Sequence, residues 1–315
     1  MKLNWIAVAL VAAVCCSICL AQPKPDKPLD PKTLEKVAAA LGDKPVAPPA
    51  QPRKIIIFTM TKGFRHSSIP LAAKTMEMMG EKTGAWKTVI TDKVEDFAAD
   101  NLAKFDAVVI DQCTGDLFKD LPKDKQDEMK KGLVEFVKGG KGIVGIHAAT
   151  DCFYNWAEYG EMMGGYFQGH PFGHISVKVE DPAHPLNAMF EGKSFEIKDE
   201  IYTFKKPYSR DSLRILLSMD WAGSGYHEST ANRPDKDFAL VWIREFGKGR
   251  VFYTAFGHQD HIFWHPEIMK QLLAGTQYAI GDLKADATPS AKADVKVVPG
   301  PQLPPKAPPK PKVKK

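Results

Sequence analysis

Four short apolar runs, separated by helix-like segments, constrain the fold of this chain more than any other feature. The runs cover residues 55–59, 86–91, 105–111 and 142–147. The last of them, GIVGIH, is apolar without alternation, as in a strand buried on both faces of a parallel sheet. One helix is predicted to run to about residue 80, capped by Ser67 or Ser68 and with Pro70 in its first turn, and another over 123–138. This order predicts an α/β fold with right-handed crossovers between parallel strands.

The second half of the chain is richer in predicted strands. A helix is expected over 156–167 and a closing helix over 266–279. Strands are expected at 174–179, 213–217, 238–246 and 250–255. A tight turn at Lys248 and Gly249 pairs the last two strands as a hairpin. We therefore predict one α/β domain over 54–283, with a mostly parallel sheet and a β-rich second half.

The first residues have the pattern of a secretory signal peptide. Lys2 precedes an uncharged apolar run, and small residues allow cleavage after Ala21. An uncleaved membrane anchor is an alternative, because the run approaches the length of a spanning helix. Lipid attachment at a cysteine of this segment is another alternative. The expected location is secreted or periplasmic, with residues 1–21 as the signal peptide.

Proline, lysine and alanine dominate the segments on either side of the predicted domain. Residues 22–53 are interpreted as a linker in which 34–41 could form one or two helical turns, and residues 284–315 as an extended, disordered tail. The basic tail is either simply solvated or a tether to an anionic cell surface. Residues 1–53 carry +3 and the tail +6, which leaves −4 of the total +5 for 54–283. This distribution argues against a nucleic-acid partner for the folded part.

Polar side chains follow the predicted strands directly. The carboxyl ends of parallel strands form the edge of a sheet where ligands bind. His66 follows the first strand, His147 ends the fourth run, and His258 follows the last strand. Asp151 and Glu200 also follow apolar segments. General acid–base chemistry is one possibility, with His147 and His258 transferring protons and Glu200 or Asp151 as orienting group or second base.

Two other chemistries remain open. A divalent, zinc-like metal could be bound by three imidazoles and a carboxylate, although the chain has no closely spaced ligand pair. The candidate metal ligands are His147, His170, His258 and Glu200. Nucleophilic catalysis by Cys152 or Ser67 is the third possibility. Cys113 and Cys152 form either a disulfide or two separate thiols. No nucleotide cofactor is expected, because the glycines do not have a dinucleotide-binding spacing.

Three side chains are candidates for holding a substrate. Lys62 and Arg65 can bind a hydroxyl or carboxylate, and Trp264 can stack on a sugar ring. Each also has a simpler interpretation, as a solvated loop charge or as part of the core.

Five motifs resemble those of the trehalose-utilisation ThuA-like family. They are TMTKGFRHSSIP at 59–70, GIHAATD at 145–151, GGYFQGHP at 164–171, DEIY at 199–202, and GKGRVFY with the following GH at 247–258. The motifs occur in the family's order and span nearly all of 54–283. The resemblance implies a three-layer sandwich like that of class I glutamine amidotransferases, flavodoxin-like in outline. It also implies a role in carbohydrate metabolism, through disaccharide use and keto-sugar processing.

The resemblance also assigns a set of polar positions. The matching residues are His66, His147, His170, Glu200, Tyr202 and His258. His147 stands where an amidotransferase has its cysteine, which argues against glutamine hydrolysis. We expect an enzyme that acts on a sugar or keto-sugar by isomerase-, epimerase- or lyase-type proton transfer, with Arg65 and Tyr202 holding hydroxyls. A non-catalytic sugar-binding module and a metal-dependent hydrolase are the alternatives.

Overall fold

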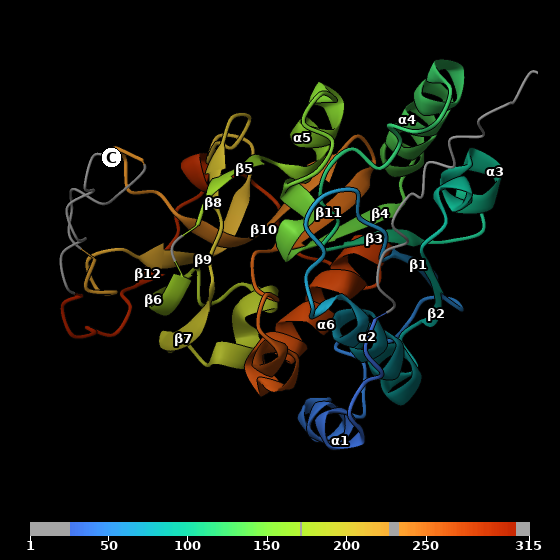
Figure 1. The fold of residues 1–315 in the computed structure, drawn as a ribbon. Helices are drawn as coiled ribbons and strands as arrows, with labels where there is room; N and C mark the ends of the chain where they lie inside the picture. Colours follow the sequence, from blue (N-terminus) through green and yellow to red (C-terminus); the bar gives the residue numbers. More distant parts are fainter. Residues whose placement is uncertain (1–25, 171, 227–232, 307–315) are drawn as a thin grey trace, which may run out of the picture.

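A single large sheet forms the middle layer of the protein (Figure 1). The computed structural model describes residues 26–170, 172–226 and 233–306, so the predicted signal peptide lies outside the described residues. The strand order is β12-β6-β9-β10-β11-β4-β3-β1-β2, with β7 paired to β6. Among the described helices, none has both the length and the apolar character needed to cross a membrane.

The parallel half of the sheet matches the prediction closely. Its strands are β1 (Lys54–Phe58), β2 (Lys87–Thr91), β3 (Ala107–Asp111), β4 (Gly142–Ile146) and β11 (Gly249–Thr254). Neighbouring strands in this half all pair in parallel. Every residue of β3 and β4 is buried, as expected for strands covered on both faces. The carboxyl ends of these strands therefore meet at one edge.

The other half of the sheet is antiparallel. It contains β6 (Phe172–Glu180), β7 (Phe195–Glu200), β9 (Arg214–Asp220), β10 (Ala239–Phe246) and β12 (Val297–Val298). The predicted hairpin is confirmed, because β10 and β11 pair antiparallel with Phe246 opposite Gly249. A separate small sheet joins β5 (Tyr166–Gly169) to β8 (Thr203–Lys205).

Helices cover both faces of the sheet and give the predicted three-layer α/β fold (Figure 1). One face carries α1 (Pro31–Ala40), α2 (Ile69–Thr83) and α6 (Pro266–Ile280). The other face carries α3 (Ala99–Leu102), α4 (Lys123–Lys138) and α5 (Ala157–Met163). Short 3-10 turns are η1 (Val94–Phe97), η2 (His147–Thr150), η3 (Pro185–Phe190), η5 (Asp260–Trp264) and η6 (Ser290–Lys292).

The helix predicted over 156–167 is too long. It ends at Met163, because Gly164 adopts a left-handed conformation with φ 102°. The residues that follow, Tyr166–Gly169, form β5 and pair with β8. This change of direction places the next segment, which contains His170, beside the end of β7.

The segment before the domain is not a free linker. Helix α1 packs on the core through Val37, which is fully buried, and through Leu41. Lys82 of α2 donates from Nζ to the carbonyl oxygens of Ala38 and Leu41, at 2.7 and 2.8 Å. The linker interpretation of 22–53 is therefore wrong for this part, because a few buried apolar residues suffice to dock one helix.

The expectation of a disordered tail is wrong for residues 284–306. Ser290 donates its backbone N–H to Leu213, β12 pairs with β6, and Leu303 donates to Gly223. Backbone hydrogen bonds thus hold a segment that buries few large apolar side chains.

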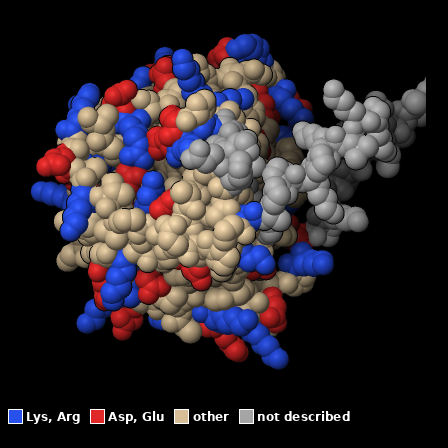
Figure 2. All heavy atoms as spheres, turned by 90° about the vertical axis from the view of Figure 1, so that its left-hand side faces the viewer, with Lys and Arg blue, Asp and Glu red and all other residues tan. Residues whose placement is uncertain are grey.

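Figure 2 shows basic and acidic side chains interspersed on the face that lies at the left of Figure 1. Contact of the tail with an anionic surface stays a prediction.

Candidate active site

Four side chains from distant parts of the sequence converge at the carboxyl edge of the sheet. His66 lies between β1 and α2, His147 follows β4, Glu200 ends β7, and His258 follows β11. One ligand atom from each residue lies within 4.8 Å of the corresponding atoms of the others. We call these four residues the His–Glu cluster. Three of the strands that position them are in the parallel half, whose carboxyl ends meet at this edge.

His147 is fully buried and has an unusual backbone. Its φ of 45° is in the left-handed region, which a residue with a side chain rarely adopts. Two hydrogen bonds fix it: the ring Nδ1 lies 2.8 Å from the carbonyl oxygen of Ala255, and Tyr253 donates its hydroxyl to the His147 carbonyl at 2.6 Å. Such local strain persists only where the surroundings hold it.

Gly257 allows the loop that carries His258 to pass close to His147. Its φ of 136° excludes most side chains, and a Cβ there would lie 3.2 Å from the Ile146 side chain. Asp199, which is buried, accepts hydrogen bonds from the backbone N–H groups of Gly257 and Gln259, at 2.9 and 3.0 Å. The loop is therefore fixed from both sides.

The contact with Ala255 determines the tautomer of His147. A carbonyl oxygen only accepts, so Nδ1 carries the hydrogen and the neutral ring has its lone pair on Nε2. This Nε2 atom is buried and has no hydrogen-bond partner among the described residues. It lies 3.5 Å from Oε2 of Glu200. The lone pair thus faces the centre of the cluster.

Glu200 connects three imidazoles. Its Oε2 lies 3.1 Å from Nδ1 of His258, and its Oε1 lies 3.2 Å from Nδ1 of His170. Burial alone would raise the pKa of Glu200, but the neighbouring imidazoles of His147 and His258 outweigh burial and lower it well below its usual range. The neighbouring carboxylate of Glu200 also raises the pKa of His258. Glu200 is therefore a carboxylate at neutral pH.

His66 completes the cluster from the loop between β1 and α2. Its side chain is 3 % exposed, and its Nδ1 is buried without a hydrogen bond to any residue that the structure describes. Its ring lies edge-on to those of His147 and His258, at 4.9 and 5.3 Å between centroids. Burial, aided by these neighbouring imidazoles, lowers the pKa of His66 to about 3. His66 is therefore neutral at physiological pH and offers a lone pair.

The side chain of Ser68 hydrogen-bonds to a loop of the site and does not cap helix α2. It stands at the N-cap position of α2, yet its side chain makes no capping bond. Its hydroxyl instead donates to the carbonyl oxygen of Gly257 at 2.8 Å. The predicted capping role is thus wrong, because this contact ties α2 to the loop that carries His258.

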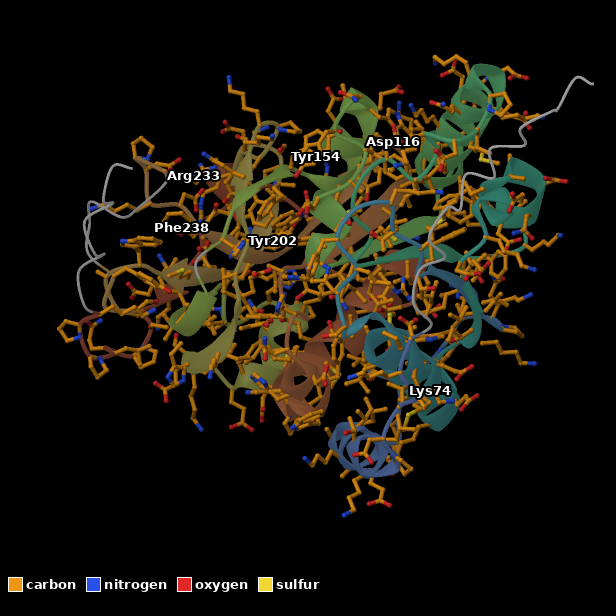
Figure 3. All side chains as sticks on the ribbon, in the orientation of Figure 1. Lys74, Asp116, Tyr154, Tyr202, Arg233 and Phe238 are labelled. Carbon is orange, nitrogen blue, oxygen red and sulfur yellow. The ribbon has the colours of Figure 1, made fainter. Side chains whose placement is uncertain are left out.

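Asp151 and two tyrosines lie beside the cluster. Asp151 is half-buried and accepts a hydrogen bond from the Tyr154 hydroxyl, and burial raises the pKa of Asp151. The ring of Tyr202 lies 4.3 Å from that of His147 and 4.3 Å from that of Phe167. Both tyrosines are labelled in Figure 3. Burial raises the pKa of Tyr202, so its hydroxyl keeps its hydrogen and can donate.

Three predicted substrate-binding residues already have partners within the protein. Lys62 forms an ion pair with Asp120, at 2.6 Å. Arg65 donates to Asp26 and to the carbonyl oxygen of Thr59, the latter at 2.8 Å. The structure does not bring Trp264 to the cluster. Its ring packs against the core near α1, with the amine of Lys36 5.0 Å from its centroid.

Two exposed aromatic residues near the site were not predicted from the sequence. Phe64 is 67 % exposed, and its ring lies 4.9 Å from that of His66. Tyr154 is also exposed, next to Asp151. A hollow of about 560 Å³ opens beside His66, with residues 26–30 in its wall. The only sequence signal was the position of Phe64 in the loop of His66, because exposure cannot be read from residue type.

Both cysteines of the described chain are free thiols, so the disulfide alternative is not observed. Cys152 is fully buried, and its Sγ lies 3.3 Å from the carbonyl oxygen of Ala149. Burial raises the pKa of Cys152, which disfavours the reactive thiolate. This environment does not favour nucleophilic catalysis by Cys152.

Comparisons of the sequence and the structure with known proteins agree on the family and the fold. The sequence profile of a family described as trehalose utilisation, ThuA, matches residues 54–279. No curated protein matches the sequence. The structure of a ThuA-like protein from Bacteroides uniformis ATCC 8492 is similar with a TM-score of 0.60 and 19% identity, covering 80% of this chain and 98% of that one. A ThuA-like protein from Parabacteroides merdae ATCC 43184 gives 0.53 and 18%, with 78% and 100% covered. At these identities the structures show a shared fold.

Proposed function

Because this chain belongs to the ThuA family of trehalose utilisation, we propose that it is an exported enzyme that acts on a sugar or keto-sugar by proton transfer. Isomerases, epimerases and lyases use this type of chemistry. The observation that carries the proposal is the convergence of the His–Glu cluster, with Asp151 beside it. A purely structural surface protein, with no ligand to bind, would not need these side chains to converge.

Proton transfer in a keto-sugar begins at a carbon next to the carbonyl group. The reaction requires a base for that proton and a polar group that stabilises the enediolate oxygen. Asp151 is the carboxylate at the side of the cluster, four residues after His147 and hydrogen-bonded to the Tyr154 hydroxyl. We assign proton abstraction to Asp151 and stabilisation of the oxygen to the cluster. This assignment refines the expectation that His147 and His258 exchange the protons.

The surroundings of the cluster suit a carbohydrate. Phe64 and Tyr154 offer exposed aromatic rings on which the apolar face of a sugar can pack. His170 is 43 % exposed and contacts Glu200, so it can reach a hydroxyl group of a bound sugar.

A sugar-binding module without catalysis is the main alternative. Such a module would use the same aromatic rings, but it would gain nothing from His66 and His147 held in the interior with unsatisfied ring nitrogens. Buried polar atoms without partners reduce stability, so their retention favours a chemical role.

Solvent exchange measured by proton NMR tests the proposal. A panel of keto-sugars and the parent sugars is incubated with the protein in D₂O. We expect loss of the signal from the hydrogen next to the carbonyl, followed by signals of an isomer or elimination product. Binding without exchange would contradict the enzyme and support the module. Release of free sugars without deuterium at that carbon would indicate the metal-dependent hydrolase instead.

Matched variants assign the exchange to the site. Asp151→Asn should slow exchange by about 10²- to 10⁴-fold, the usual contribution of a general base. His174→Ala is the control, because this histidine is 54 % exposed and its one described ion pair is with Glu196. Equal exchange rates in the two variants would remove Asp151 from the mechanism.

A further inference from the structure

We infer that the His–Glu cluster is a binding site for one divalent transition-metal ion, with Zn²⁺ as the reference ion. The ligands are Nδ1 of His66, Nε2 of His147, an oxygen of Glu200 and Nδ1 of His258. The inference deepens the proposed function by naming its cofactor, and only the catalytic role of the ion rests on that function. The binding site itself stands on the geometry below.

The spacing of the four ligand atoms fits one ion. Zinc bonds of roughly 2.0–2.2 Å in a tetrahedron place the ligand atoms about 3.3–3.6 Å apart. Oε2 of Glu200 lies 3.1 Å from Nδ1 of His258 and 3.5 Å from Nε2 of His147. All four ligand atoms lie within 4.8 Å of one another. A small inward movement of the most distant pair therefore completes the coordination.

The atoms at the centre need a cation between them. The bond from His147 to Ala255 leaves a lone pair on Nε2, which faces a carboxylate oxygen that also only accepts. His66 adds a third buried atom, Nδ1, which makes no hydrogen bond to the described residues. One proton can satisfy only one of these contacts. A single cation satisfies all of them, because every ligand is an electron-pair donor.

The residues around the cluster have the arrangement of a metal site's outer shell. Metal-binding histidines usually donate their second ring N–H to a carbonyl or carboxylate, as His147 does to Ala255 at 2.8 Å. Ligating carboxylates are themselves hydrogen-bonded, and Oε1 of Glu200 lies 3.2 Å from His170. Asp199 holds the backbone next to His258. His170, expected as a ligand, therefore belongs to this outer shell, and His66 takes its place.

The ligand types select the class of ion. Imidazole nitrogen suits zinc, iron, nickel or copper, whereas magnesium and calcium prefer sites built from oxygen atoms. Three imidazoles and one carboxylate therefore favour a transition metal. Such an ion, when bound, polarises a carbonyl oxygen of the substrate as a Lewis acid. With the four cluster residues occupied as ligands, Asp151 is the proton acceptor.

Calorimetric titration with Zn²⁺ tests the site directly. The full, tag-free chain is stripped with EDTA, dialysed and titrated, and Mg²⁺ is titrated in parallel. We expect one Zn²⁺ per chain and much weaker Mg²⁺ binding. Titration with Co²⁺ should also produce the visible absorption bands of a nitrogen-rich site. Absence of a one-to-one Zn²⁺ site would overturn the inference.

Two ligand variants and one control locate the ion. His66→Gln and Glu200→Gln should each weaken Zn²⁺ binding by more than about 100-fold, since even outer-shell changes cost 10- to 100-fold. Two variants are used because either one could fold poorly, and circular dichroism in EDTA checks the fold. His174→Gln, at an exposed histidine outside the cluster, should bind Zn²⁺ like the wild type. Wild-type affinity in both folded ligand variants would place the ion elsewhere and refute the assignment.

The outcome is separable from that of the proposed function. If Zn²⁺ does not bind but keto-sugar exchange in D₂O persists in EDTA, the metal inference fails and the function stands. If Zn²⁺ binds at the cluster but no sugar exchanges, the site stands and the function fails.

Discussion

The site has a floor, formed by the His–Glu cluster, and a rim, formed by Lys62, Phe64 and Arg65. The two differ in how many hydrogen-bond partners their polar groups have. On the floor, His66 and His147 each have a buried ring nitrogen without a hydrogen bond to the described part of the chain. On the rim, Lys62 is paired with Asp120, and Arg65 donates to Asp26 and Thr59. Groups at the rim already have protein partners, whereas the floor holds buried acceptors that are available to an added ligand. In this protein, a buried polar atom that lacks a hydrogen-bond partner marks a site residue better than a charged side chain does.

The largest effect is expected from the centre of the floor. His147→Ala should abolish sugar turnover, because it removes a cluster member and the bond that orients it towards Glu200. The chain should remain folded, since β4 keeps its pairs with β3 and β11. NMR assays measure turnover, and circular dichroism measures folding. Turnover within tenfold of the wild type in a folded variant would refute the role of the floor.

A smaller loss is expected behind the floor, at Asp199. Asp199→Asn retains one carboxamide oxygen and so can keep only one strong acceptor for the N–H groups of Gly257 and Gln259. The loop with His258 should loosen, and Zn²⁺ affinity should fall by about 10- to 100-fold. Calorimetry gives the affinity. An unchanged value would show that the loop holds His258 without Asp199.

The aromatic part of the rim should affect substrate affinity only. Phe64→Ala should raise KM by about 2- to 10-fold with kcat nearly unchanged, because stacking contributes about 0.5–1.5 kcal/mol. Phe64→Tyr keeps the ring and should restore KM. A fall in kcat in the alanine variant alone would instead move Phe64 into the catalytic floor.

The smallest effects are expected from the paired charges of the rim. Lys62→Ala should change turnover less than about threefold, and the denaturant midpoint should hardly move, because the ion pair with Asp120 is exposed to solvent. Initial rates and the denaturant midpoint measure the two quantities. A tenfold loss of turnover would mean that Lys62 leaves Asp120 and binds substrate, and the contrast between floor and rim would fail.

The parallel half of the fold could be predicted from the sequence because each buried strand carries its own signal. Strands buried on both faces are continuous apolar runs, and β3 and β4 were found within two residues of their ends. The predictions for the segments on either side of the domain were wrong because overall composition does not reveal individual buried side chains or backbone pairs. Val37 alone marks the buried face of α1, and β12 is held by pairing with β6, which has no compositional signal.

The site was predicted in outline and corrected in detail. His147, His258 and Glu200 were identified because they follow strands that end at one edge. The structure places His66, and not His170, at the centre of the cluster, since the sequence does not show whether a loop turns its side chain inward. His66 is buried against His147, while His170 stays largely exposed beside Glu200. Only the tertiary path of the two loops separates a ligand from its outer-shell partner.

Anomalous X-ray scattering at the zinc edge, from crystals of the wild-type chain grown with Zn²⁺, tests the central claim most directly. The account predicts one strong peak about 2.0–2.2 Å from the ligand atoms of His66, His147, Glu200 and His258. A Zn²⁺ peak at another site, with only water at the centre of the cluster, would contradict it.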